Sequence, residues 1–230
     1  MSNASFEKWK EFYLLSEQNG KELLWPCENL IRLFKGKYIS DFERSFEGKK
    51  LLEVGFGSGN NLIFFNTLDL KLFGTEVAQE ICDNYSKKLA SLNISAILKE
   101  GTNTCIPFED NYFDYLVSWN VIHYENSEEN MLKALKEYSR VLKPGGRFFI
   151  STTGPENSIL RDSMKISDHL YRITRNDTFR EGEIYFYFDD ESSINYYFSN
   201  NYKDIKIGRT KTDLFSECLD WFIITAINRG

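Results

Sequence analysis

The chain has 230 residues, of which 42% are hydrophobic and 27% charged, so it can form one domain with a buried core and is not a disordered protein. Its net charge of -6 disfavours a general nucleic-acid binder, although the sequence does not exclude a local basic patch. The four cysteines show no CxxC pair and no cluster with histidine, which argues against a disulfide framework and a zinc site (Cys27, Cys82, Cys105, Cys218). We therefore expect no bound metal.

No apolar run approaches the length that a membrane span needs. The first residues, MSNASFEKWKEFYLL, have neither the charge order nor the apolar core of a signal peptide. We expect a cytoplasmic protein that has no membrane partner.

Residues 5–47 are predicted to form a helical N-terminal cap. The stretches FEKWKEFYLLSE and ENLIRLFKGKYISDFERSF carry apolar residues at three- and four-residue spacing, as amphipathic helices do. Pro26 separates the two stretches and favours a new helix start near Glu28.

Residues 48–153 alternate between strand-like and helix-like segments. KLLEVGF, LKLFGTEV, SAILKEG, YFDYLVSW and RFFIST are the predicted strands. The clearest helix follows Ser127, has acids in its first turn and stops at Lys143-Pro144-Gly145-Gly146. Alternating strands and helices predict a parallel sheet covered by helices on both faces.

The last third of the chain divides into an insert and a closing unit. Residues 154–188 form a probable substrate-side insert, in which ENSILRDSMKISDHLYRI predicts an amphipathic helix. Residues 189–230 predict a helix capped near Asp189 and two strands whose short link lets them pair antiparallel. The expected fold is a single α/β, Rossmann-like domain over 1–230, with a seven-stranded, mostly parallel sheet and an antiparallel last strand.

The first predicted strand ends in a glycine-rich turn, EVGFGSGN. Gly55, Gly57 and Gly59 let the backbone bend tightly and approach a ligand without interference from a Cβ atom, although a purely structural turn stays open. In the dinucleotide fingerprint G-x-G-x-x-G the third glycine comes one residue later, where this chain has Asn60. The early glycine weakens an NAD or FAD interpretation.

Two carboxylates accompany this turn. Glu53, two residues before the first glycine, suits an amino group or another positive centre better than a pyrophosphate. Glu76 ends the second strand, about 20 residues past the glycines, where an acid can accept both hydroxyls of a ribose. The pair predicts a nucleoside that carries a charged amino-acid group.

From about Lys49 through Thr152 the chain resembles class I S-adenosylmethionine-dependent methyltransferases of the small-molecule type. The family's E/D-x-G-x-G-x-G turn matches EVGFGSG, and its acid after strand two matches Glu76. The resemblance implies S-adenosylmethionine as cofactor, with the ribose on Glu76 and the adenine on Val77. It assigns the amino-acid end to the turn (Glu53, Gly55, Phe56, Gly57, Gly59, Asn60).

Two further stretches carry the resemblance. In EGTNTCIPFEDNYFDYLVSW, Thr102 replaces the family's acid that binds the adenine amino group, and Thr102 or the neighbouring Asn103 can still accept that hydrogen bond. SWNVIHYENSEENMLKALKEYSRVLKPGGRFFIST matches the fourth-strand loop, helix and glycine turn. By position, the resemblance implies that Asn120 and Val121 line the methionine side and that His123 and Tyr124 lie nearest the methyl group.

The reaction implied is in-line methyl transfer, which needs a positioned acceptor and exclusion of water rather than a protein nucleophile. His123 is the candidate base and Tyr124 a wall of the methyl pocket, whereas His123 as a packing residue stays open. We expect a small-metabolite acceptor such as a sugar or biosynthetic intermediate.

Four other functions stay open, and the sequence predicts no oligomeric state. A protein or RNA acceptor is an alternative on the same fold, although the acidic charge disfavours RNA. NVIHY lacks the prolines of an N/D-P-P-Y motif, which disfavours DNA. A dinucleotide-dependent oxidoreductase and a non-catalytic cofactor-binding protein are the alternatives of a different class.

Residues near the second predicted helix offer a possible lid. Trp25, Glu28 and Arg32 could close over the cofactor or acceptor. Equally, Trp25 could pack and Glu28–Arg32 could be a surface pair one helical turn apart.

Overall fold

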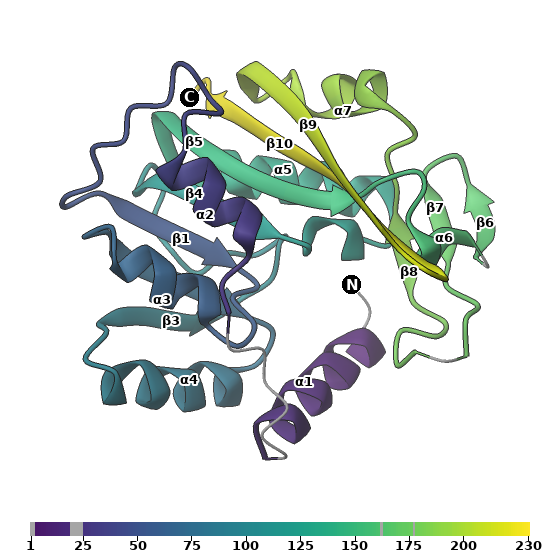
Figure 1. Ribbon diagram of the computed structural model, residues 1–230, viewed down its shortest axis with the longest axis horizontal. Helices are drawn as coiled ribbons and strands as arrows, with labels where there is room; N and C mark the ends of the chain where they lie inside the picture. Colours follow the sequence, from purple (N-terminus) through teal and green to yellow (C-terminus); the bar gives the residue numbers. More distant parts are fainter. Residues whose placement is uncertain (1–2, 19–24, 162, 177) are drawn as a thin grey trace.

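The computed structural model describes residues 3–18, 25–161, 163–176 and 178–230 (Figure 1). A seven-stranded sheet runs through it in the order β3-β2-β1-β4-β5-β10-β9. The strands are β1 (Lys50–Val54), β2 (Lys71–Glu76), β3 (Ala96–Glu100), β4 (Phe113–Trp119), β5 (Leu142–Thr153), β9 (Tyr202–Leu214) and β10 (Glu217–Asn228).

The pairing confirms the predicted sheet. β1 pairs in parallel with both β2 and β4, and β4 pairs in parallel with β5. The last strand, β10, lies between β5 and β9 and is antiparallel to both. Strand order therefore reverses at β1, so the glycine turn that follows β1 sits where ligands bind in open α/β sheets.

Helices cover both faces of the sheet. One face carries α2 (Glu28–Lys35), α3 (Asn60–Asn66) and α4 (Gln79–Ser91), whose apolar residues join one core cluster. The other carries α5 (Glu128–Val141) and α7 (Glu191–Phe198), which join a second cluster. Ser127 caps α5 as predicted, because its hydroxyl accepts a hydrogen bond from the Asn130 N–H at 3.1 Å. The cap of α7 is Asp190, one residue later than predicted.

The predicted cap of 5–47 is helical only in part. α1 spans Asn3–Gln18, α2 ends at Lys35, and residues 36–49 contain no helix. The prediction failed there because Ile39, Phe42 and Phe46 have the spacing of a helix but belong to an irregular segment. This segment packs on the sheet and buries the three side chains in the core. Residues 19–24 of the predicted cap lie outside the described residues.

The predicted insert helix was wrong. The insert instead forms a four-residue α6 (Ser158–Arg161) and a small antiparallel sheet of β6 (Met164–Ser167), β7 (Leu170–Arg172) and β8 (Ile184–Phe186). Tyr171 of β7 pairs with Tyr185 of β8. The spacing of apolar residues within one short segment cannot predict such a contact between two separate segments. Residues 162 and 177, within the insert, lie outside the described part.

Helix α1 lies apart from the sheet, between α4 and the insert strands (Figure 1). Lys10 forms a salt bridge of 3.2 Å with Glu80 of α4, and the Lys8 ammonium donates to the Glu181 carbonyl at 2.7 Å. The N-terminal helix thus bridges two elements that the sheet does not connect. Among the described residues, no helix has the length and apolar character that crossing a bilayer requires.

Candidate functional site

The turn after β1 holds three glycines in the left-handed region, with φ of +67° at Gly55, +54° at Gly57 and +70° at Gly59. A Cβ atom on Gly55 would lie 2.6 Å from a methyl carbon of Val121, so this glycine lets the loop after β4 pack on the turn. A Cβ atom on Gly57 would lie 2.8 Å from the Tyr13 hydroxyl. Side chains are excluded at both positions by conformation and by space.

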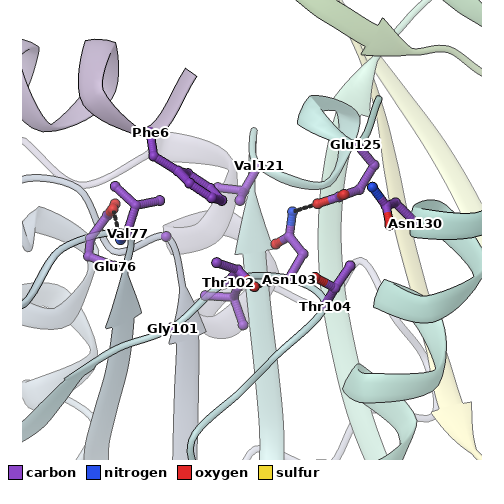
Figure 2. Close-up of a pocket in the computed structure, with 12 residues that line it drawn as sticks. Phe6, Glu76, Val77, Gly101, Thr102, Asn103, Thr104, Val121, Glu125 and Asn130 are labelled. Atoms are coloured by element: carbon purple, nitrogen blue, oxygen red, sulfur yellow. Dashed lines mark hydrogen bonds between the residues drawn. The ribbon is translucent and has the colours of Figure 1, made fainter. Parts of the chain in front are cut away.

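A cavity of about 250 Å³ opens beside the turn, and Figure 2 shows the residues around it. Six of its lining residues were predicted from the sequence: Gly55, Glu76, Val77, Thr102, Asn103 and Val121. Six others were missed: Phe6, Val54, Gly101, Thr104, Glu125 and Asn130. Phe6 reaches the cavity from α1, and nothing in the local sequence of that helix indicates a binding role.

Glu76 is fixed at the end of β2. One carboxylate oxygen accepts from the Gly57 N–H at 3.1 Å and the other from the Val77 N–H at 2.8 Å. The side chain is buried, and burial raises its pKa although both hydrogen bonds oppose the rise. Each carboxylate oxygen keeps acceptor capacity, so Glu76 can take the hydroxyls of a ribose.

Glu53 is buried behind the turn rather than lining the cavity. One oxygen accepts from the Asn61 amide at 2.7 Å, whereas Oε2 has no hydrogen-bond partner among the described residues. Burial raises the Glu53 pKa to about 8, and the nearby Glu76 carboxylate adds to the rise. An uncompensated buried acceptor of this kind suits an ammonium group.

Asn103 and Glu125 form a buried polar pair at the other side of the cavity (Figure 2). The Asn103 amide donates to Glu125 at 2.7 Å, and its oxygen accepts from the Tyr138 hydroxyl at 2.7 Å. The amide oxygen that the sequence offered for adenine is therefore already engaged. Thr102, whose hydroxyl lies 3.3 Å from that of Thr104, remains the better candidate acceptor.

The loop after β4 begins in the left-handed region at Asn120, with φ of +60°. The Asn120 N–H donates to the Ser151 hydroxyl at 2.9 Å, and that hydroxyl donates to the Asn120 amide oxygen. These bonds fix the loop to β5 and place Val121 against the turn.

Besides Glu53, Gly57 and Asn120, three other predicted cofactor residues do not line the cavity, namely Phe56, Gly59 and Asn60. The Phe56 ring packs near Tyr85 in the core, with ring centres 6.0 Å apart. Gly59 is the residue before α3, and Asn60 is the first residue of that helix. Their contribution is to shape the turn.

His123 and Tyr124 lie in an aromatic cluster rather than at the cavity. Its buried members are Trp9, Tyr124, Ile173 and Tyr185. The His123 ring centre lies 4.5 Å from that of Tyr124 and 4.9 Å from that of Tyr185. Burial lowers the His123 pKa to about 3, and Nδ1 has no hydrogen-bond partner within the described residues. His123 is therefore neutral at physiological pH.

The possible lid near α2 is on the surface. Trp25 is 73% exposed, and Glu28 and Arg32 form an exposed ion pair of 2.6 Å. The structure therefore supports the surface pair of Glu28 and Arg32, whereas the predicted packing of Trp25 was wrong.

The donors and acceptors around the glycine turn and the cavity beside it fit a nucleoside that bears an ammonium group. The orphaned Glu53 oxygen, the turn without Cβ atoms and the buried Glu76 carboxylate provide the three complementary features. No group of histidines, cysteines and acids that could hold a metal ion is found in the described ranges.

Comparisons with known proteins agree with this geometry. Residues 52–150 match a family model described as a methyltransferase domain. A sterol 4-C-methyltransferase of Caenorhabditis elegans is 32% identical over 129 residues, which are 55% of this chain and 38% of that protein. An uncharacterized methyltransferase of Bacillus subtilis is 25% identical over 137 residues, 59% of this chain and 52% of that one. The chain thus spans about half or less of the length of these relatives.

Solved structures share the fold at low identity. A methyltransferase from Methanosarcina mazei superposes with a TM-score of 0.68 at 16% identity, over 88% of this chain and 98% of that one. The 1,6-didemethyltoxoflavin-N1-methyltransferase of Burkholderia thailandensis gives 0.66 at 12% identity, over 99% and 89%. The domain match, the fold and the fitting cavity together support a class I S-adenosylmethionine-dependent methyltransferase, with S-adenosylmethionine as its cofactor.

Proposed function

We propose that this protein transfers the methyl group of S-adenosylmethionine to a small metabolite. The observation that carries the proposal is the buried Glu76 carboxylate, which lines a cavity beside the glycine turn, together with the orphaned Glu53 oxygen behind that turn. A pyrophosphate would meet the buried Glu76 carboxylate there, with a second buried acid behind the turn, which disfavours the dinucleotide-dependent alternative.

The residues divide the work of binding. Glu76 takes the ribose hydroxyls, Val77 and Phe6 pack on the adenine, and Thr102 accepts from the adenine amino group. Glu53 takes the ammonium group. The bound cofactor supplies a methyl group on a sulfonium, and the chain contributes orientation and exclusion of water.

The acceptor side is the aromatic cluster formed by α1, the loop after β4 and the insert. Trp9, Tyr124 and Tyr185 are buried in it, and the guanidinium carbon of Arg180 lies 5.7 Å from the centre of the Trp9 ring. A buried aromatic cluster on this side favours a small acceptor over an RNA or a folded protein.

The relatives leave the acceptor open, since their names include a sterol methyltransferase and, over 48 residues, a tRNA methyltransferase. A small acceptor is in line with the toxoflavin-type enzyme and with a phosphoethanolamine methyltransferase of similar fold. The free cysteines support a cytoplasmic location as part of the proposal.

Calorimetric titration with S-adenosylmethionine and separately with NAD tests the proposal. We expect micromolar binding of the first and none of the second. Binding of NAD alone would assign the protein to a different class, and binding of neither would contradict the cofactor assignment. Transfer of a labelled methyl group into fractionated metabolites then identifies the acceptor, and label recovered only in RNA or protein would overturn the small-acceptor proposal.

A further inference from the structure

Tyr13 of α1 reaches the glycine turn from the side opposite the sheet. Its hydroxyl lies 2.8 Å, and its ring 3.3 Å, from the position of a Cβ atom on Gly57. Phe6, about two turns earlier on the same helix, lines the cavity. One face of α1 therefore meets the site at two separate points.

The charges on the sheet side do not suit every part of an amino-acid group. Glu53 and Glu76 are both buried there, and the Gly57 N–H already donates to Glu76. An ammonium group is well placed beside Glu53. A carboxylate of the same ligand is repelled by these two acids, so donors on another side of the turn suit it better.

The α1 side offers those donors. Burial raises the pKa of Tyr13 well above its ordinary value, so the hydroxyl keeps its proton at neutral pH. The Glu76 carboxylate adds to this rise, whereas the positive charge of Arg180 opposes it. The Arg180 guanidinium carbon lies 5.7 Å from the centre of the Trp9 ring, which stacks on Tyr13. A hydroxyl donor supported by a nearby cation complements an anionic group.

Contacts on both sides hold Tyr13 in this position. Trp9 stacks on Tyr13 with ring centres 5.8 Å apart, and Trp9 also packs edge-on against Tyr124 at 5.0 Å. The salt bridge between Lys10 and Glu80 fixes the same helix to α4. The hydroxyl is thus oriented by packing rather than by chance rotation of a surface side chain.

We propose that the Tyr13 hydroxyl donates a hydrogen bond to the carboxylate at the amino-acid end of the cofactor, which makes α1 part of the binding site. This inference rests on the proposed function, because it presumes that S-adenosylmethionine binds at the turn. It separates the ligand's two charges: the ammonium group faces the sheet and the carboxylate faces α1.

The test compares two ligands on one conservative variant, Tyr13→Phe. S-adenosylhomocysteine carries the amino-acid group, whereas 5′-methylthioadenosine lacks it. By calorimetry we expect Tyr13→Phe to lower the affinity for S-adenosylhomocysteine by about tenfold to 100-fold and to leave that for 5′-methylthioadenosine unchanged. Tyr38→Phe, at a tyrosine that is 67% exposed, is the control and should change neither affinity.

Each result decides the question. Equal losses for the two ligands would show that Tyr13 only packs α1 over the site, and unchanged or tighter binding of S-adenosylhomocysteine would show that Tyr13 makes no such bond. Wild-type affinity for 5′-methylthioadenosine also proves that the variant is folded. If the wild-type protein binds neither ligand, the proposed function itself fails.

Discussion

The two sides of the cavity are built in different ways. Its floor consists of strand ends, where Val54 and Glu76 are fixed by parallel pairing of adjacent strands and the Gly101 N–H donates to the Glu76 carbonyl at 2.9 Å. Its roof is α1, which contributes Phe6 and which packs against the insert through Trp9, Tyr124 and Tyr185. The floor is held by backbone hydrogen bonds, and the roof by side-chain packing between segments that are distant in sequence.

This difference indicates that the floor determines cofactor binding and that the roof determines how the bound ligand is held. The buried Glu76 of the floor and the buried Glu53 behind it complement a nucleoside with an amino-acid group. The roof combines aromatic rings with the cation of Arg180 and lies outside the strand pairing of the seven-stranded sheet. We expect changes in the floor to abolish cofactor binding and changes in the roof to alter how the bound ligand is held.

Gly57→Ala should produce the largest effect, because it breaks the floor directly. The new Cβ atom would enter the space between the turn and Tyr13, and we expect loss of S-adenosylhomocysteine binding by at least about 100-fold in calorimetry. Gly48→Ala is the matched control, since Gly48 also has a positive φ, +71°, but no atom lies within 4 Å of its Cβ position. Both variants should lose about 1–2 kcal/mol of stability, because alanine is strained in the left-handed region. Equal affinity of the two variants for S-adenosylhomocysteine would contradict the assignment of the glycine turn as the binding site.

Glu76→Ala should weaken binding by about 1–3 kcal/mol, since it removes charge-assisted hydrogen bonds to the ribose. The matched control is Glu100→Ala, because Glu100 pairs in register with Glu76 on the neighbouring strand but is exposed and does not line the cavity. Isothermal titration of both variants checks this. Equal affinity of the two variants would mean that the ribose is held elsewhere.

The floor could be predicted from the sequence because its elements are local. The strand, the glycine turn and the acid two residues earlier lie within one short stretch, and Glu76 ends the next strand. The seven-stranded sheet followed from the same alternation of apolar runs. Glu125 was missed although it adjoins Tyr124, since its carboxylate reaches the cavity only through the turn after β4.

The roof could not be predicted in this way. Phe6 and Tyr13 become binding candidates only because α1 docks across the strand ends, and that docking depends on contacts with α4 and the insert. The insert itself was assigned as a helix, because pairing of Tyr171 with Tyr185 is a non-local contact. The periodicity of apolar residues indicates which face of a segment is buried, but not which distant segment packs against that face.

The buried acid Glu53 should make stability fall as pH rises. Its pKa is about 8 in the folded protein against an ordinary 4.5, so between these values the folded state holds more protons than the unfolded state. The free energy of unfolding should therefore decrease from pH 5 to pH 8, by at most about 1.4 kcal/mol per pH unit from this group. Urea unfolding at four pH values measures the slope. Glu53→Gln should reduce the dependence of the unfolding free energy on pH, whereas Glu47→Gln, at an exposed position, should not. An unchanged slope in Glu53→Gln would show that other groups cause the pH dependence.

His123 should show the smallest effect, because it stays neutral. Burial among aromatic rings lowers its pKa to about 3, so between pH 5 and pH 8 its imidazole gains no proton and has little basicity to offer a reacting acceptor. The chain has only two histidines, so a His169→Gln variant leaves one imidazole to follow by NMR. We expect its ring resonances to stay constant across that pH range. A titration near neutrality would instead show that the roof opens to water in solution and would make His123 a working general base on the acceptor side.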